Sequence, residues 1–186
     1  MKAKPSAAAK AAKKPSAPKS RSAAAQGASA ALAGKRAPAF ALAGGEGRTV
    51  ALKDLIGSRN LVLYFYPRDM TPGCTVEACG FRDNVDRLRT LGANVVGISA
   101  DSSAAHAKFA GKYSLNFPLL ADPDNQVTRA YGVYKKKSLY GREFMGIERT
   151  TFLIDKSGMV RKVFPKVKVD GHTEEVIAAL NLMPKK

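Results

Sequence analysis

Two uninterrupted apolar runs predict the centre of a sheet. Residues 61–66 read LVLYFY and end at Pro67, and residues 94–99 read NVVGIS. Short apolar runs without polar alternation are typical of strands that are buried on both faces. Between them, residues 75–91 place apolar side chains at helical spacing, and Gly92 provides a stop signal. The pattern therefore predicts a strand, a helix and a second strand in this order.

Shorter segments on either side extend this pattern. Residues 135–147 are polar and include Lys135, Lys136 and Lys137, so we interpret them as a solvated loop. The remaining predictions are a hairpin of 39–42 with 49–52, a helix over 102–113, a strand at 119–120, a helix over 124–131, a hairpin of 150–154 with 159–164, and a helix over 173–180. This order predicts an α/β domain with a mixed central sheet flanked by helices.

The first 36 residues differ from the rest in composition and charge. The chain has 186 residues and a formal net charge of +16. Residues 1–36 hold nine lysines or arginines and no acidic residue, and consist mainly of alanine, lysine, serine and proline. Such a segment buries too little apolar surface to offset the entropy of ordering, so we expect a disordered basic tail before one domain at 37–186. The tail lacks the apolar core of a secretory signal. It could be a solvated arm, a targeting segment or a contact for nucleic acid or another polyanion.

Composition excludes several classes of protein. No apolar run approaches the roughly 20 residues that a membrane-spanning helix needs. Two cysteines and two histidines are a thin set for a structural metal site, and we expect neither a metal nor an organic cofactor. Neither His106 nor His172 belongs to a motif, so we predict a surface or capping role for each histidine.

The candidate chemistry gathers at Cys74. The loop 67–74 joins the buried strand to the following helix, so this cysteine should lie at a helix N-terminus, where free N–H groups and the helix dipole favour a thiolate. Thr71 offers a hydroxyl three residues earlier. Cys79 lies five residues further, and on an ideal helix the two Cα atoms would be roughly 8–9 Å apart. A disulfide needs about 4.4–6.8 Å, so the two thiols could bond only if the first helical turns unwind.

At these residues the sequence resembles a known family. Residues 65–84, FYPRDMTPGCTVEACGFRDN, resemble the active-site segment of the peroxiredoxins, and the cysteine spacing is similar to that of the peroxiredoxin Q type, also called bacterioferritin comigratory protein. Residues 146–155, GIERTTFLID, resemble the later segment that supplies an active-site arginine. The resemblance covers about residues 37–182. It implies a thioredoxin-like fold with an N-terminal hairpin, and the following roles: Cys74 as the peroxidatic cysteine, Cys79 as the resolving cysteine, Thr71 as a hydroxyl donor, Pro67 as a shielding proline, Arg149 beside the thiolate, and Glu77 holding the network together.

The resemblance also implies an activity. An atypical two-cysteine peroxiredoxin would reduce hydrogen peroxide and organic hydroperoxides through a Cys74 sulfenic acid and a Cys74–Cys79 intramolecular disulfide, and thioredoxin or a glutaredoxin-like dithiol would recycle it. We expect an antioxidant enzyme, a monomer or weak dimer without a membrane partner, in the bacterial cytoplasm, or in a nucleus or organelle if the tail is a targeting signal. The alternative is a DNA- or polyanion-binding protein that uses residues 1–36, with the peroxidase domain secondary.

Overall fold

A computed structural model describes residues 27–45, 47–139 and 141–183, and within them a mixed sheet forms the centre of the fold. Seven strands lie in the order β2-β1-β5-β4-β3-β8-β9. The strands β3, β4 and β5 run parallel to one another, and every other neighbouring pair is antiparallel. The strand bounds are β1 Ala41–Gly44, β2 Thr49–Ala51, β3 Asn60–Phe65, β4 Ala93–Ser99, β5 Leu119–Ala121, β8 Thr150–Ile154 and β9 Val160–Phe164. This arrangement confirms the predicted α/β, thioredoxin-like class.

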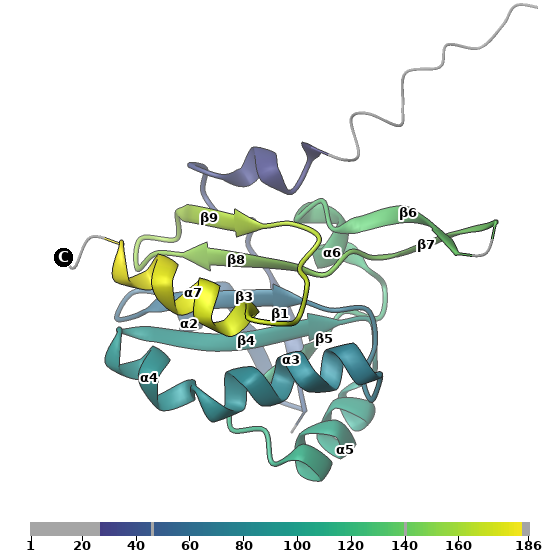
Figure 1. The fold of residues 1–186 in the computed structure, drawn as a ribbon, viewed down its shortest axis with the longest axis horizontal. Coiled ribbons are helices and arrows are strands. Elements are labelled where there is room, and N and C mark those ends of the chain that lie inside the picture. The colour runs from purple at the N-terminus through teal and green to yellow at the C-terminus, as the bar shows by residue number, and fades with distance from the viewer. Residues whose placement is uncertain (1–26, 46, 140, 184–186) are drawn as a thin grey trace, which may run out of the picture.

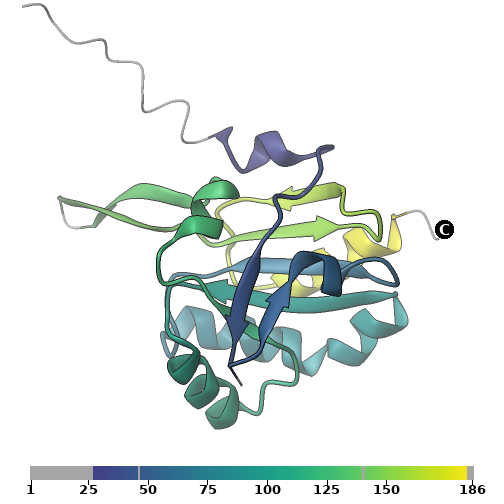
Figure 2. The same ribbon diagram turned by 180° about the vertical axis from the view of Figure 1, so that it is seen from behind.

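Helices cover both faces of the sheet. Figure 1 shows α3, α4 and α7 on the near face with α5 at its lower edge, and Figure 2 shows α2 and α6 on the opposite face. The helix bounds are α2 Leu52–Leu55, α3 Pro72–Asp83, α4 Val85–Thr90, α5 Ser103–Tyr113, α6 Gln126–Ala130 and α7 His172–Asn181. Within the described residues, no helix combines the length and the apolar character that crossing a membrane requires.

The central strand β3 separates two apolar cores because its side chains alternate between the faces of the sheet. Val62 and Tyr64 pack with α3, α4, α5 and α7, whereas Leu61, Leu63 and Phe65 pack with α2 and α6. All five side chains are fully buried. The unbroken apolar run in the sequence therefore reflects burial on both faces, as predicted.

Two predicted elements differ from the structure. Residues 135–147 are not a loop but the antiparallel hairpin of β6 (Tyr134–Leu139) and β7 (Arg142–Ile147). Its exposed positions carry charged side chains and also two adjacent apolar ones, Phe144 and Met145, so the apolar alternation that marks a half-buried strand is missing. The helix expected over 75–91 is two helices, because at Asn84 the backbone leaves helical geometry (φ −112°, ψ 9°).

Residues 27–36 belong to the fold, so the predicted disorder of the tail is wrong for them. Ala30–Leu32 form a 3₁₀ helix, labelled η1, and Ser29 is fully buried. The chain then pairs with the start of β9: Gly34 N–H donates to the Val160 carbonyl and Val160 N–H to the Lys35 carbonyl, both at 2.8 Å. Composition missed this because the backbone, not the side chains, makes these hydrogen bonds. The prediction for residues 1–26 lies outside the described residues.

Candidate active site

Cys74 lies at the start of α3, as predicted. Thr71 is the N-cap, Pro72 is the first helical residue and Cys74 is the third, with 1% of its surface exposed. Proline suits this position because its ring fixes the φ angle near the helical value. A backbone N–H at the first helical residue would have no partner within the helix, so its absence costs nothing. The N–H groups of a first helical turn have no carbonyl partner within the helix. The sulfur is therefore close to unpaired donors and to the positive end of the helix dipole.

Arg149 joins Cys74 to Glu77. It lies between β7 and β8, and one guanidinium nitrogen is 3.2 Å from the Cys74 sulfur while the other donates to Glu77 Oε2. Both side chains are shielded, with 15% of Arg149 and 1% of Glu77 exposed. Gly73 permits this approach, because a Cβ there would lie 3.2 Å from the same guanidinium nitrogen that contacts Cys74. The structure thus brings together three of the predicted site residues.

Burial and charge act in opposite directions on this pair. Desolvation raises the pKa of Glu77 from 4.5 to about 7, although the Arg149 guanidinium opposes the rise. Burial also acts to lower the pKa of Arg149, but Glu77 and Cys74 more than offset it, so the net shift is upward. Arg149 therefore stays positively charged beside the sulfur across the physiological pH range.

The other predicted site residues flank this centre without joining it. The Thr71 hydroxyl donates to the Arg68 carbonyl at 3.0 Å, and no hydrogen bond links it to Cys74 in the structure. Pro67 is half-buried and lies two residues after β3. Cys79 is half-buried on the same helix as Cys74, and both are free thiols. Because α3 is intact, the expected separation of roughly 8–9 Å between their Cα atoms applies.

The second half of α3 is held by α7. A Cβ on Gly80 would lie 2.8 Å from the Thr173 hydroxyl oxygen, so glycine allows the two helices to approach closely. Next to it, the Phe81 ring meets the His172 ring edge-on, with centroids 6.0 Å apart. These contacts hold α3 against α7 directly after Cys79.

The lysine-rich segment lies beside the site and is not simply solvated, contrary to our prediction. Lys135 is buried and pairs with Glu148 at 2.7 Å. Lys137 donates to the Ile147 carbonyl at 2.7 Å, and burial lowers its pKa. Lys136 alone fits the prediction, being exposed in a surface pair with Glu143. The hairpin β6–β7 is thereby fixed at its base, immediately before Arg149.

Both histidines are buried, so a surface or capping role is wrong for each. His172 shares a hydrogen bond of 2.8 Å with the Thr151 hydroxyl, and burial lowers its pKa. His106 has no exposed surface and lies 2.8 Å from the Asp69 carboxylate in the loop that precedes Cys74. The sequence contained a signal for His106, since it lies three residues before the buried Phe109 and so on the same helical face. Asp69 and His106 are thus neighbours of the site that the sequence did not reveal.

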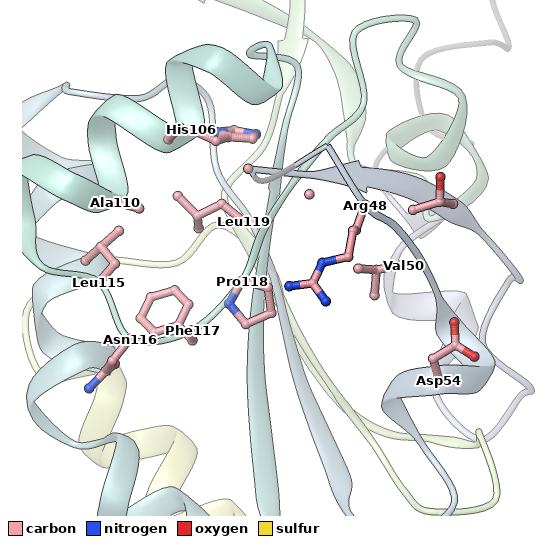
Figure 3. A pocket seen from close by; sticks show the side chains of 14 residues that line it. Arg48, Val50, Asp54, His106, Ala110, Leu115, Asn116, Phe117, Pro118 and Leu119 are labelled. Carbon is pink, nitrogen blue, oxygen red and sulfur yellow. The ribbon is translucent and has the colours of Figure 1, made fainter.

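A separate pocket of about 740 Å³ lies between the β1–β2 hairpin, α5 and the segment before β5. Figure 3 shows His106 and Ala110 on one wall and Arg48 and Val50 on the other. Its lining includes neither Cys74 nor Arg149. The pocket is therefore distinct from the candidate active site.

Comparisons with known proteins agree with this geometry. The AhpC/TSA family matches residues 33–163. Peroxiredoxin Bcp of Bacillus subtilis is 48% identical over 153 residues, which are 82% of this chain and 97% of that protein. The solved structure of Xanthomonas campestris peroxiredoxin Q has a TM-score of 0.73 at 41% identity and covers 76% of this chain and 89% of its own. The solved structure of Mycobacterium tuberculosis BcpB has a TM-score of 0.74 at 36% identity, and the match covers 82% of this chain and 98% of that one.

These relatives do not favour the alternative of a nucleic-acid-binding protein. A buried cysteine at a helix start, an arginine on its sulfur and relatives of this similarity together show that the chain belongs to the AhpC/TSA family, as a peroxiredoxin of the Q or Bcp type.

Proposed function

We propose that the protein is a thiol peroxidase in which Cys74 reduces peroxides. The contact of Arg149 with both Cys74 and Glu77 carries this proposal. It holds a positively charged guanidinium beside the Cys74 sulfur in a shielded site. The thiolate would attack one peroxide oxygen, and the O–O bond would break. Its electron pair would leave with the second oxygen, which takes up a proton to give water or an alcohol. Arg149 and the free N–H groups of the helix start would stabilise the developing charge.

The proposal assigns Cys79 the second step. Oxidised Cys74 is a sulfenic acid, and the Cys79 thiol would attack its sulfur, form the intramolecular disulfide and release water. The two Cα atoms are too far apart for this bond while α3 is intact, so the first helical turns must unwind. Thr71 and Pro67 border the moving segment, where the hydroxyl would donate to the peroxide and the proline would exclude water.

The substrate and reductant follow from the same chemistry. Hydrogen peroxide and organic hydroperoxides both contain the O–O bond that the thiolate attacks. One solved structure of the Xanthomonas campestris bacterioferritin comigratory protein concerns its alkyl peroxide reduction activity. A thioredoxin or glutaredoxin-like dithiol would return the disulfide to two thiols by exchange. We propose an atypical two-cysteine enzyme, a monomer or weak dimer, that contributes to antioxidant defence in a reducing compartment such as the bacterial cytoplasm.

Peroxide consumption by Cys74→Ser is the direct test. With thioredoxin, thioredoxin reductase and NADPH present, the wild-type protein should consume peroxide and the variant should not, because no thiolate attacks the O–O bond. Circular dichroism and thermal unfolding would establish that the variant is folded. Turnover by the folded variant would refute the proposal.

Cys79→Ser separates the two steps. This variant should reduce one equivalent of peroxide at the wild-type rate and then stop, with Cys74 trapped as a sulfenic acid that dimedone labels. Normal recycling by thioredoxin would show that Cys79 is not the resolving residue, while leaving the role of Cys74 intact.

A further inference from the structure

The loop before Cys74 is fastened to the body of the protein by one buried carboxylate. The Tyr66 hydroxyl donates to Asp69 Oδ1 at 2.7 Å, and His106 Nδ1 donates to Asp69 Oδ2 at 2.8 Å. Tyr66 and His106 have no exposed surface, and Asp69 is 8% exposed. Tyr66 follows β3 and His106 belongs to α5, so the carboxylate joins the loop to two separate parts of the core.

The backbone at Asp69 is held as well. Its N–H donates to Asp101 Oδ2 at 2.9 Å, and that oxygen also accepts from the Ser99 hydroxyl at 2.7 Å. Ser99 ends β4, so a third element supports the loop. We name the three residues Tyr66, Asp69 and His106 the loop anchor.

The chain turns sharply directly after the anchor. Met70 has φ +60°, in the left-handed region that residues other than glycine seldom adopt, and 41% of its side chain is exposed. An exposed side chain contributes little to holding such a conformation, so neighbouring contacts must maintain it. The anchor supplies them on one side, and the first turn of α3 supplies them on the other.

We propose that the loop anchor positions Cys74 in the form that reacts with peroxide and opposes the unwound form in which Cys74 reaches Cys79. This inference rests on the proposed function. Asp69, Tyr66 and His106 do not touch the sulfur, so they are positioning residues. Losing one hydrogen bond to a buried carboxylate should shift the equilibrium between the intact and the unwound start of α3 by roughly tenfold to a hundredfold.

The two steps should respond to the anchor in opposite directions. Without it, Cys74 is in place beside Arg149 for a smaller fraction of the time, so the reaction with peroxide slows. The unwound form is more populated, so disulfide formation becomes faster. A change that only lowered the amount of folded protein would slow both steps, which makes the opposite signs diagnostic.

The variants are chosen to remove single contacts. Tyr66→Phe deletes one hydroxyl, and His106→Leu removes the ring donor at similar volume. His106→Asn is the conservative variant, since its amide nitrogen can replace Nδ1. Thr151→Val is the matched control, because it also deletes one buried hydroxyl that bonds a histidine, but away from the loop.

Three measurements on the full-length chain test the inference. Competition against catalase gives the rate of the reaction with hydrogen peroxide, and quenched-flow alkylation gives the rate of disulfide formation. We expect Tyr66→Phe and His106→Leu to raise the second rate roughly tenfold or more and to lower the first rate by a smaller factor, His106→Asn to restore both, and Thr151→Val to change neither. Amide exchange of residues 68–76 in the reduced protein should accelerate in the same two variants.

The inference fails if both rates fall together, or if loop exchange is unchanged in Tyr66→Phe. Amide exchange needs no turnover, so it tests the anchor independently. If the wild-type protein consumed no peroxide while loop exchange behaved as expected, the proposed function would be wrong, but the structural role of the anchor would stand.

Discussion

Glu77 is a buried carboxyl group that should make the stability of the protein depend on pH. Its pKa is raised to about 7 in the folded protein, against 4.5 for the free group, chiefly because burial disfavours the charged form. The folded state therefore holds this proton more tightly than the unfolded state. The resulting stability is fully present below about pH 4.5 and is lost as the pH rises through about 7.

The size of the effect follows from the shift. A difference of 2.5 pKa units corresponds to about 3 kcal/mol in total. Linkage gives a loss of about 2 kcal/mol in the free energy of unfolding between about pH 5.5 and pH 8 from this group alone. Glu77→Gln cannot lose a proton, and its amide oxygen can still accept from Arg149, so it should lack this loss.

Urea unfolding followed by circular dichroism across this pH range measures the effect. Both proteins should carry Cys74→Ser, so that the neighbouring thiol does not titrate, and the remaining groups, including His172, cancel when the two curves are subtracted. We expect the free energy of unfolding of Cys74→Ser to fall by about 2 kcal/mol relative to that of the double variant with Glu77→Gln. A difference that is flat or rises with pH would show that Arg149 keeps the carboxylate ionised and that burial is the weaker influence.

Three further predictions address the site, the packing and the N-terminal segment. Arg149→Ala should slow the reaction of Cys74 with peroxide roughly a hundredfold in a competition assay, because one preorganised donor is lost, and an unchanged rate would remove Arg149 from the chemistry. Gly97→Ala should destabilise the protein by about 1–3 kcal/mol in urea unfolding, since a Cβ would lie 2.7 Å from the Tyr64 ring, whereas Gly111→Ala, with open space around it, should stabilise the helix slightly. Deleting residues 1–26 should leave the peroxidase rate unchanged, and a loss of activity would give that segment a catalytic role.

The sequence predicted the core of the fold better than its margins. The strands around Val62 and Val96 were recognisable because burial on both faces produces an unbroken apolar run. The hairpin β6–β7 was not, because it projects from the body with much of its surface exposed and lacks apolar alternation (Figure 1). Residues 27–36 were missed because their order comes from backbone pairing with β9.

The candidate site shows the same division. The family resemblance pointed to Cys74, Glu77 and Arg149, and the structure brings these three side chains together. The anchor at Asp69 could not be predicted, because it joins residues that are far apart in the chain. His106 is 37 positions from Asp69, and only the packing of α5 against the sheet brings them into contact.

The docking of α3 on α7 distinguishes the surroundings of the two cysteines. The contact of Gly80 with Thr173 fixes the helix from the residue after Cys79 onward, while the turns that carry Cys74 lie outside that contact. Under the proposed mechanism, Cys74 would therefore move toward Cys79, which adjoins the part of α3 that α7 holds. Cys74 belongs to the apolar core beneath α3, α4, α5 and α7, so under the proposed mechanism oxidation should loosen that core locally, while the core beneath α2 and α6 and the helix after Cys79 should stay in place.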